Sequence, residues 1–486
     1  GWGVPAQRTS IMLLAVAVLR SRGLVWPWHA VLAWAAVAVL LADPWALMQA
    51  GFWLSFVAVA VLFATSTPQP QPGSAWRKVR DKWLGFFRTQ GIITAVLAPL
   101  TLLLFGQVSV VGFVANALAV PLVTFVVTPL ALLGVAWAPL WQLAAWVLNY
   151  LMQGLQTLSA LSWANYHAAA APWWVGVAGV AGGLLAVLRL PLPWRLSGAL
   201  ALVPVLLWQA PRPAPGHFDL LAADVGQGSA VLVRTRHHSL LFDAGPRYSI
   251  TSNAGERVLL PLLLTLDETP EWLVLSHEDT DHVGGAEALV QAYPQLQLLG
   301  AIASTHPLQA QRPVVPCVAG QHWRWDGVDF RILHPLASAQ DGIDKVSNSL
   351  SCVLHISNGK RSALLPGDVE VAQESAILAR LAEAGVSLQA DVLLAGHHGS
   401  KTSTSAEWLA AVQPRLALVQ QGYANRYQHP HPSVVQRLQQ HGVAVHVSEA
   451  CGAAWWRSDD NTLYCERIDR RRYWQHPGDP YMAGSR

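Results

Sequence analysis

One short segment, residues 276–285, gathers the side chains whose types and spacing best suit chemistry. It follows the apolar run Trp272–Leu275 and contains the pattern His-x-Asp-x-Asp-His-x-Gly-Gly. Its potential metal ligands are His277, Asp279, Asp281 and His282. Divalent metals bind imidazole nitrogens and carboxylate oxygens that converge at about 2 Å, and a turn held by a rigid strand can supply them. The segment therefore predicts a metal centre, whereas a lone charged turn would predict only a solvated surface.

Further polar side chains follow other apolar runs in the same half of the chain. Asp224 and Asp243 each begin an Asp-x-Gly sequence, and Asp368 lies in a Gly-Asp pair. His397 and His398 are adjacent and precede a Gly-Ser pair. Each of these alone would most often be an ordinary turn or a surface histidine. In this order within one domain, they predict a bridging carboxylate and an imidazole that complete the centre.

Short apolar runs that end at Gly, Asp or His predict the strands that must position these residues. The predicted strands are Phe218–Ala222, Ala230–Arg234, Ser239–Phe242, Trp272–Leu275, Ser351–Ile356, Ser362–Leu365, Val392–Leu394, Leu416–Val419 and Val443–Val447. Helical patterns lie at Ala286–Ala292, Val371–Ala384, Ala406–Val412 and Ser433–His441. Strands that alternate with helices indicate an α/β layered domain.

The charges divide the chain at the Pro-rich run 211–216. Residues 1–216 contain 11 basic residues (Lys and Arg) and two acidic residues (Asp and Glu), which gives a net charge of +9. Residues 217–486 contain 21 basic and 27 acidic residues, which gives a net charge of −6. Hydrophobic residues make up 52% of the 486 residues and charged residues only 13%, against about 25% charged residues in soluble proteins. We therefore expect a membrane region followed by an acidic, His-rich soluble domain.

The first half has the composition of a multi-span membrane region, since residues 91–188 contain no Asp, Glu, Lys or Arg. Hydropathy predicts apolar segments at about Thr9–Leu19, Leu24–Leu41, Ala46–Thr65, Gly91–Phe105, Gly112–Trp137, Leu140–Leu161, Trp173–Leu188 and Leu196–Trp208. Basic residues gather in three clusters, namely Arg20 with Arg22, Arg77–Lys82 with Arg88, and Arg189 with Arg195. The positive-inside bias places all three clusters in the cytoplasm and the second half on the outer, periplasmic face.

Some polar residues stand out within this apolar half. Asn116, Gln49 and Ser55 are candidates for lining a polar pathway, although helix packing or a loop turn is the more common role of such residues. The segment Trp76–Arg88 mixes aromatic and basic side chains, which favours an interfacial amphipathic helix over a contact with nucleic acid.

The order of the motifs in the second half resembles that of the metallo-β-lactamase superfamily, and the whole chain is similar to DNA-internalisation (competence) proteins of the ComEC type. The further segments that carry this resemblance are Asn348–Leu350, Asn425–Pro432, Pro5–Arg8, Asp43 with Gly51–Phe56, and Asn116 to Pro121. The membrane motifs are weak singly, but their coupling to this hydrolase-like domain is specific.

The resemblance implies a polytopic α-helical membrane region followed by an αββα metallo-β-lactamase-like domain. The expected boundaries are 1–210 for the membrane region, 211–217 for the linker, 218–468 for the domain and 469–486 for a polar tail. Members of this family also carry a soluble N-terminal region and further spans. Because residue 1 is Gly, we expect the chain to be part of a longer protein.

The function that the resemblance implies is DNA uptake in natural transformation. An inner-membrane protein of this kind passes one DNA strand into the cytoplasm, and its metal-dependent nuclease domain is expected to degrade the other strand. Its expected partners are DNA, membrane lipid and other proteins of the competence machinery. Two alternatives stay open, namely a transporter with an inactive hydrolase-like domain and a membrane-anchored hydrolase of another ester. The acidic balance of the second half favours the latter alternative.

The predicted chemistry is phosphodiester hydrolysis with one or two divalent ions, Mn²⁺ or Zn²⁺. Asp279 stands where the superfamily usually has a second His, and no clear His fills the third motif, which favours an oxygen-rich first site and the harder Mn²⁺. The predicted metal ligands are His277, Asp279, Asp281, His282, Asp368 and one of the adjacent pair, with His397 preferred.

The remaining site residues receive supporting roles. The candidate catalytic residues are Asp281, His398, His429 and Lys401, and the residues expected behind the ligands or beside a phosphate are Asp224, Asp243, Asn348 and Ser400. If the domain lies outside the cytoplasm, Cys451 and Cys465 are candidates for a disulfide, with buried free thiols as the alternative.

Overall fold

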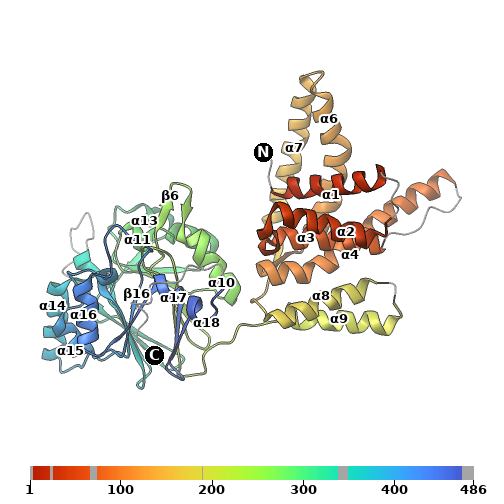
Figure 1. The fold of residues 1–486 in the computed structure, drawn as a ribbon. Coiled ribbons are helices and arrows are strands. Elements are labelled where there is room, and N and C mark those ends of the chain that lie inside the picture. Colours follow the sequence, from red (N-terminus) through yellow and green to blue (C-terminus); the bar gives the residue numbers. More distant parts are fainter. Residues whose placement is uncertain are drawn as a thin grey trace. The chain divides into compact units, whose positions relative to one another are not determined.

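The computed structural model describes residues 4–21, 26–65, 74–161, 163–188, 190–337 and 348–472. Arg22, Arg189 and most of the predicted tail lie outside the described residues. The chain divides into two compact units, residues 1–210 with 264–267, and residues 211–263 with 268–486. Figure 1 shows a mainly helical first unit and a second unit built from two sheets with helices.

The first unit consists of helices joined by short connections. The helices are α1 (Val4–Ser21), α2 (Trp28–Ala42), α3 (Ala50–Thr65), α4 (Ala75–Phe105), α5 (Gly112–Leu122), α6 (Thr128–Leu133), α7 (Pro139–Ser159), α8 (Trp173–Val187) and α9 (Leu192–Leu206). The 3₁₀ turn η1 (Pro44–Met48) precedes α3, the π-helical turn η2 (Val123–Val127) joins α5 to α6, and the strands β1 (Gln107–Ser109) and β2 (Asn165–His167) pair. Within the described residues, each apolar segment predicted from hydropathy is mainly helical.

One expectation changes in this unit. The predicted interfacial segment Trp76–Arg88 and the predicted span from Gly91 form one continuous helix, α4, of 31 residues. A single glycine inside a helix costs only about 1 kcal/mol relative to alanine, so Gly91 does not interrupt it. In Figure 1, α6 and α7 form a hairpin that stands at a steep angle to α2, α3 and α4.

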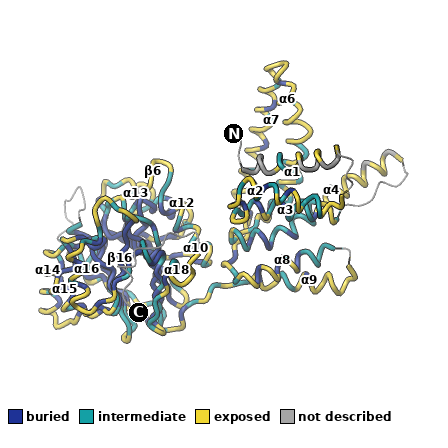
Figure 2. The backbone as a smooth tube through the Cα atoms, viewed as in Figure 1, coloured by how far each residue is buried: buried dark blue, intermediate teal, exposed yellow. Residues whose placement is uncertain are grey.

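The helices of this unit bury little of their apolar surface against one another. Among the described residues, two helical stretches are long and apolar enough to cross a membrane, Trp76–Phe105 and Gly112–Leu133, by length and composition alone. In the most apolar 18-residue window of each, 22% and 0% of the residues, respectively, are buried. Figure 2 shows the exposed surface of α6 and α7 in contrast to the buried interior of the second unit. Exposed apolar surface of this extent is typical of helices that contact another protein or a lipid bilayer.

Helices α8 and α9 form the closest helix pair in the unit because glycines face each other across it. A Cβ atom on Gly198 would lie 2.6 Å from the carbonyl oxygen of Gly182 and 2.7 Å from the amide nitrogen of Ala186. Small residues of this kind let helix backbones approach without a hydrophobic driving force, as is common inside membranes.

The second unit is an αββα sandwich. One sheet has the order β10-β9-β8-β5-β4-β3-β18-β19 and the other the order β11-β12-β13-β14-β15-β16-β17. The first sheet contains β3 (Asp219–Ala222), β4 (Val231–Arg234), β5 (Ser239–Phe242), β8 (Trp272–Leu275), β9 (Gln297–Gly300), β10 (Val314–Pro316), β18 (Ala454–Arg457) and β19 (Thr462–Cys465). The second contains β11 (His322–Trp325), β12 (Val328–His334), β13 (Val353–Ser357), β14 (Ser362–Leu365), β15 (Val392–Leu394), β16 (Leu416–Val419) and β17 (Ala444–Val447). The predicted sandwich is thus confirmed.

Helices accompany the two sheets. They are α10 (Leu260–Leu266), α11 (Thr280–Val283), α12 (Ala286–Ala292), α13 (Pro307–Gln311), α14 (Val371–Glu383), α15 (Ala406–Val412), α16 (Pro432–Gln440), α17 (Ser448–Cys451) and α18 (Glu466–Asp469). The largest core cluster lies between the sheets and includes Phe242, Phe330 and Trp456. A second cluster packs the seven-stranded sheet against α14, α15 and α16.

Two disulfides and a buried ion pair tie this unit together. Cys317 follows β10 in one sheet and bonds Cys352, which precedes β13 in the other, while Cys451 bonds Cys465. The Cys451–Cys465 bond, which the sequence left open beside free thiols, is therefore present, and the Cys317–Cys352 bond was not predicted. The linker is also held in place, because Arg212 pairs with the buried Glu268, which also pairs with Arg234.

Candidate metal centre

The candidate residues meet at one edge of the sandwich because the strands that carry them run in the same direction within each sheet. Strand β5 is parallel to β8, and β14, β15 and β16 are parallel to one another. Loops after the carboxyl ends of parallel strands lie side by side, which is where open α/β sheets usually bind ligands. Asp243, His277, Asp368, His398 and Gln420 each come from such a loop.

Asp243 is the fully buried centre of a hydrogen-bond network behind the site. Its Oδ1 accepts from the amide of Ser276 at 2.7 Å, and its Oδ2 accepts from Ser276 Oγ at 3.0 Å. Oδ2 also accepts from Nδ1 of His282 at 2.7 Å. With Nδ1 engaged, the Nε2 of His282 is the nitrogen that faces the site.

Three ligand-type groups converge on that nitrogen. His282 Nε2 lies 3.3 Å from Asp368 Oδ2 and 3.2 Å from His398 Nε2, and His398 Nε2 lies 3.3 Å from Asp281 Oδ2. Asp281, His282 and His398 offer atoms that all lie within 4.8 Å of one another. Asp368 is within 3.7 Å of His398 as well, which is the placement that a bridging carboxylate needs.

A second group of potential ligands overlaps the first. His277, His282 and Asp368 also place ligand atoms within 4.8 Å of one another. His277 is fully buried, and no hydrogen bond from the described residues reaches its Nε2, which lies 3.5 Å from Asp279 Oδ2. A buried imidazole nitrogen without a hydrogen bond costs free energy unless something binds it, and a metal ion would do so. The residues present therefore fit a metal centre.

Hydroxyl and amide side chains lie next to the histidines on this side of the centre. Ser351 Oγ lies 3.4 Å from Nδ1 of His277 and accepts from the amide of Asp368 at 3.2 Å. Asn348 Nδ2 lies 3.5 Å from His397 Nε2. Ser351 and Asn348 thus lie beside the histidines of the centre without adding an imidazole to either ligand group.

The adjacent histidines point in different directions because both have left-handed backbone conformations, with φ of 50° for His397 and 54° for His398. His398 is buried, and its Nδ1 donates to the carbonyl of Gln420 at 2.9 Å, which leaves Nε2 for the metal groups. His397 is one quarter exposed and lies 3.8 Å from Asp368 and 3.8 Å from Glu370. The structure thus places His398, and not His397, in the metal-ligand groups.

The electrostatics of the cluster follow from its burial and its crowding. Burial alone would lower the pKa of His282, but Asp368 and Asp243 raise it well above its ordinary value. Burial alone would raise the pKa of Asp281, yet a hydrogen bond with His398 and the charge of His282 hold it at about 2. Protons on the imidazoles here balance carboxylate charges that a divalent ion would balance instead.

Other predicted site residues lie around the cluster. His429 lies with its ring 5.9 Å from that of His397, and burial together with the charges of His398 and His397 lowers its pKa to about 4. Ser400 is buried and contacts Thr402, while Lys401 is exposed. Asp224 lies outside the metal-ligand groups, in an ion pair with Arg467 at 2.6 Å.

The three candidates for a membrane pathway lie on different elements of the first unit. Gln49 donates to Asp43 Oδ2 at 3.0 Å at the turn before α3, and Ser55 is half-buried within α3. Asn116 is exposed on α5. Within the part of the chain that the structure describes, no hydrogen bond joins these three side chains to one another, so their role as a pathway stays a prediction.

Sequence reasoning missed residues that support the site without being ligands. Ser276 was adjacent to the metal motif, and Gln420 follows a predicted strand, so position alone could have identified both. Gln420 donates to the carbonyls of Ala223 and Ala230 at 2.7 and 2.9 Å, while its own carbonyl holds His398. It therefore fastens the eight-stranded sheet to the loop that carries His398.

Comparison with known proteins identifies two domains. Residues 1–193 match the family described as "Competence protein", and residues 223–422 match the "Metallo-beta-lactamase superfamily". The chain is 35% identical over 98% of its length to "Competence protein ComA" of Neisseria gonorrhoeae and covers 65% of that protein. It is 31% identical over 85% of its length to "Recombination protein 2" of Haemophilus influenzae and covers 56% of it. The chain thus spans between about half and two thirds of these relatives.

Solved structures resemble the second unit only distantly. The metallo-β-lactamase fold protein YhfI from Bacillus subtilis aligns with 50% of this chain and 99% of its own, with 16% identity and a TM-score of 0.34.

The role of Asp243 in orienting His282 can be tested by Asp243→Asn. We expect metal affinity to fall about 10- to 100-fold, because the amide cannot accept from both Ser276 and His282 as the carboxylate does. The measurement is competition of the protein with a chromogenic chelator for Mn²⁺ or Zn²⁺. Asp224→Asn is the matched control, since Asp224 pairs with Arg467 instead, and it should bind metal like the wild type. Equal affinities of Asp243→Asn and wild type would contradict the role.

Proposed function

Because the chain joins a competence-protein domain to a domain of the metallo-β-lactamase superfamily, we propose that it is a membrane protein of DNA uptake whose second domain hydrolyses phosphodiester bonds. The observation that carries the hydrolytic part is the convergence of Asp281, His282, Asp368 and His398 on one point at the sandwich edge. Nitrogen and oxygen donors in this arrangement suit divalent ions that act on phosphate esters.

The geometry supports one assignment of the ligands within this proposal. Asp281, His282 and His398 would hold one ion, His277 and Asp279 a second, and Asp368 would lie between them. When bound, such ions supply Lewis-acid activation of a water nucleophile and neutralise charge on the phosphate oxygens. The protein contributes rigid positioning, because Asp243 fixes His282 and Gln420 fixes His398 before any substrate arrives.

His397 takes the proton-transfer role in this proposal. It is partly exposed, it lies beside Asp368 without belonging to the metal groups, and Glu370 lies 3.8 Å from its Nδ1. A histidine at the mouth of the centre, backed by a carboxylate, is suited to pass a proton to the leaving oxygen. Thr402 Oγ1, 3.4 Å from Nδ1, and Asn348 near Nε2 orient the ring.

The decisive experiment is DNA cleavage by isolated residues 211–486 with Mn²⁺, with Zn²⁺ or with a chelator. We expect metal-dependent cleavage that is abolished by chelation and by Asp281→Ala. His398→Ala should lose both activity and bound metal, whereas His397→Ala should lose activity by about 100-fold and keep its metal. A folded domain that binds metal and cleaves no DNA would refute the nuclease proposal, and metal loss in His397→Ala alone would reverse the two histidine roles.

A surface beside the centre, formed by Arg426, Tyr427 and His429 and called the lip below, supports single-stranded nucleic acid as the substrate class. The Tyr427 ring lies nearly parallel to the His429 ring at 5.7 Å, and the Arg426 guanidinium lies 4.8 Å from the Tyr427 ring centroid. Tyr427 is half exposed. The ring of His429 also lies 5.9 Å from that of His397, which is at the edge of the centre. Flat rings and guanidinium groups of this kind stack on unpaired bases.

The lip can be separated from the chemistry by using two substrates. We expect Arg426→Ala with Tyr427→Ala to raise KM for a single-stranded oligonucleotide by about tenfold, since one base stack contributes about 1–3 kcal/mol. Hydrolysis of bis(p-nitrophenyl) phosphate, which has no base to stack, should change less than twofold. An equal loss on both substrates would mean that the lip only supports the fold of the centre.

The transport part of the proposal rests on the first domain. Its relatives include proteins named for competence and recombination, and its exposed apolar helices need a membrane. In this proposal one DNA strand passes through the membrane region while the other is degraded by the second domain, with other competence proteins delivering the DNA.

The disulfides support an extracytoplasmic position of the second domain. Disulfides persist in oxidising compartments and are rare in the cytoplasm, and all four cysteines of this domain are paired. The positive-inside rule applied to the basic clusters gives the same orientation.

Fusions to alkaline phosphatase, which is active only outside the cytoplasm, test this orientation. We expect an active enzyme when it is fused after residue 216 and an inactive one when it is fused within the basic segment Arg77–Lys82, since positive charge retains that segment in the cytoplasm. The opposite pattern of activities would place the second domain in the cytoplasm.

A further inference from the structure

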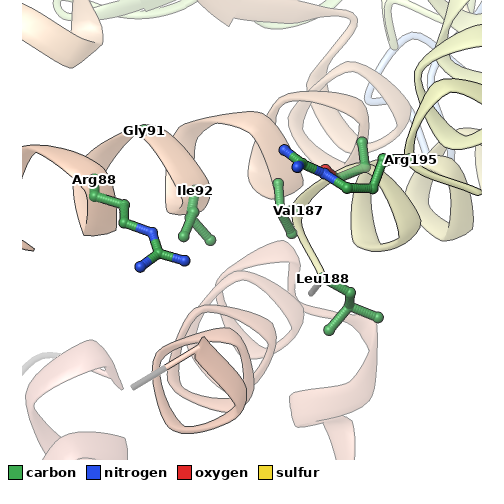
Figure 3. A pocket seen from close by; sticks show the side chains of 7 residues that line it. Arg88, Gly91, Ile92, Val187, Leu188 and Arg195 are labelled. Carbon is green, nitrogen blue, oxygen red and sulfur yellow. The ribbon is translucent and has the colours of Figure 1, made fainter. Parts of the chain in front are cut away.

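A cavity of about 310 Å³ lies in the helical unit, apart from the metal centre. It is lined by Arg88, Gly91 and Ile92 of α4, by Ala186, Val187 and Leu188 at the end of α8, and by Arg195 of α9. Figure 3 shows Arg88 and Arg195 on either side of the apolar side chains Ile92 and Val187. Two residues from separate basic clusters of the sequence are thus brought to one cavity.

Among the described residues, no acidic side chain forms an ion pair with either arginine of this cavity. Residues 1–216 contain only two acidic side chains, Asp43 and Asp81. Asp81 pairs with Arg80 at 3.0 Å, and Asp43 accepts from the amide of Trp45 and from Gln49. Within the described residues, Arg88 makes no hydrogen bond or ion pair. Arg88 and Arg195 are both exposed, so an anion from outside the chain can reach their guanidinium groups.

Arg195 is arranged to receive such an anion. Its Nε donates to the carbonyl of Ala186 at 3.1 Å, which fixes the plane of the guanidinium and leaves the terminal nitrogens free. A guanidinium held in this way binds phosphate oxygens through paired, charge-assisted hydrogen bonds.

The remainder of the cavity and its rim are apolar. Ile92, Val187 and Leu188 line the cavity between the arginines. On the outer surface nearby, Trp83 and Phe87 of α4 and Trp194 of α9 are exposed. Aromatic side chains next to basic residues at helix ends are typical of the membrane–water interface. A ligand with an anionic head and an apolar tail would match both the arginines and the apolar side chains that line the cavity.

We propose that this cavity binds the phosphodiester headgroup of an anionic membrane lipid, with Arg88 and Arg195 on the phosphate and the acyl chains along Ile92 and Leu188. The proposal rests on the membrane position of the helical unit in the proposed function, but it does not depend on nuclease activity. A DNA strand in transit fits less well, because it would not use the apolar wall and would need a run of basic residues along its backbone.

The test uses the full chain in nanodiscs that contain phosphatidylglycerol and phosphatidylcholine, followed by gentle detergent extraction and native mass spectrometry of the retained lipid. We expect the wild type to retain phosphatidylglycerol selectively. Arg88→Gln with Arg195→Gln should lower that retention at least about tenfold, since each change removes charge-assisted hydrogen bonds to phosphate. Arg77→Gln with Lys82→Gln is the matched control. It removes the same charge from α4 outside the cavity and should retain lipid like the wild type.

Further arms exclude misfolding and other sources of phosphate. Arg88→Lys with Arg195→Lys should recover part of the retention, and metal binding by the second domain should be unchanged in every variant. Equal retention by the Gln variant and the wild type would overturn the proposal. Displacement of the lipid by inorganic phosphate or by a short oligonucleotide at micromolar concentration would overturn its assignment to lipid. Failure of DNA cleavage in the same preparations would concern the proposed function alone.

Discussion

The site depends on one buried carboxylate. Asp243 accepts three hydrogen bonds, two from Ser276 and one from His282, and it is fully buried. A buried carboxylate is tolerable only when its lone pairs are satisfied, so this network fixes the path of the chain after β8. That path delivers His277, Asp279 and Asp281 to the sandwich edge. Asp243 is not a member of the metal-ligand groups, but its hydrogen bonds determine where those groups lie.

The edge is also held by contacts that join the two sheets. Gln420 follows a strand of the seven-stranded sheet and hydrogen-bonds the carbonyls of Ala223 and Ala230 beside the other sheet. The Cys317–Cys352 disulfide crosses between the sheets as well. The ligands come from both layers, so a shift of one sheet would separate Asp281 and His282 from Asp368 and His398. Fixing the layers against each other is therefore part of building the centre.

The sequence predicted most of this framework, and the exceptions have physical reasons. All nine predicted strands of the second unit are present within two residues, because buried strands are continuous apolar runs. Six strands of the two sheets were missed, namely β9, β10, β11, β12, β18 and β19. Among them, β12 shows a clear period of two, because Val328, Phe330 and Ile332 alternate with Asp329 and Arg331. The choice between His397 and His398 could not be made from sequence. It depends on the left-handed backbone at both positions, which only the folded loop reveals.

The opposite charges of the two halves suit a division of tasks. Nucleic-acid-binding domains are usually basic, yet residues from His217 onward carry a balance of −6. Several of these carboxylates lie in the metal groups, where bound cations would offset them. The first half, with a balance of +9, has basic residues next to apolar helices. In the two proposals, each half would therefore recognise phosphate in its own way, the second half through bound metal ions and the first through arginine.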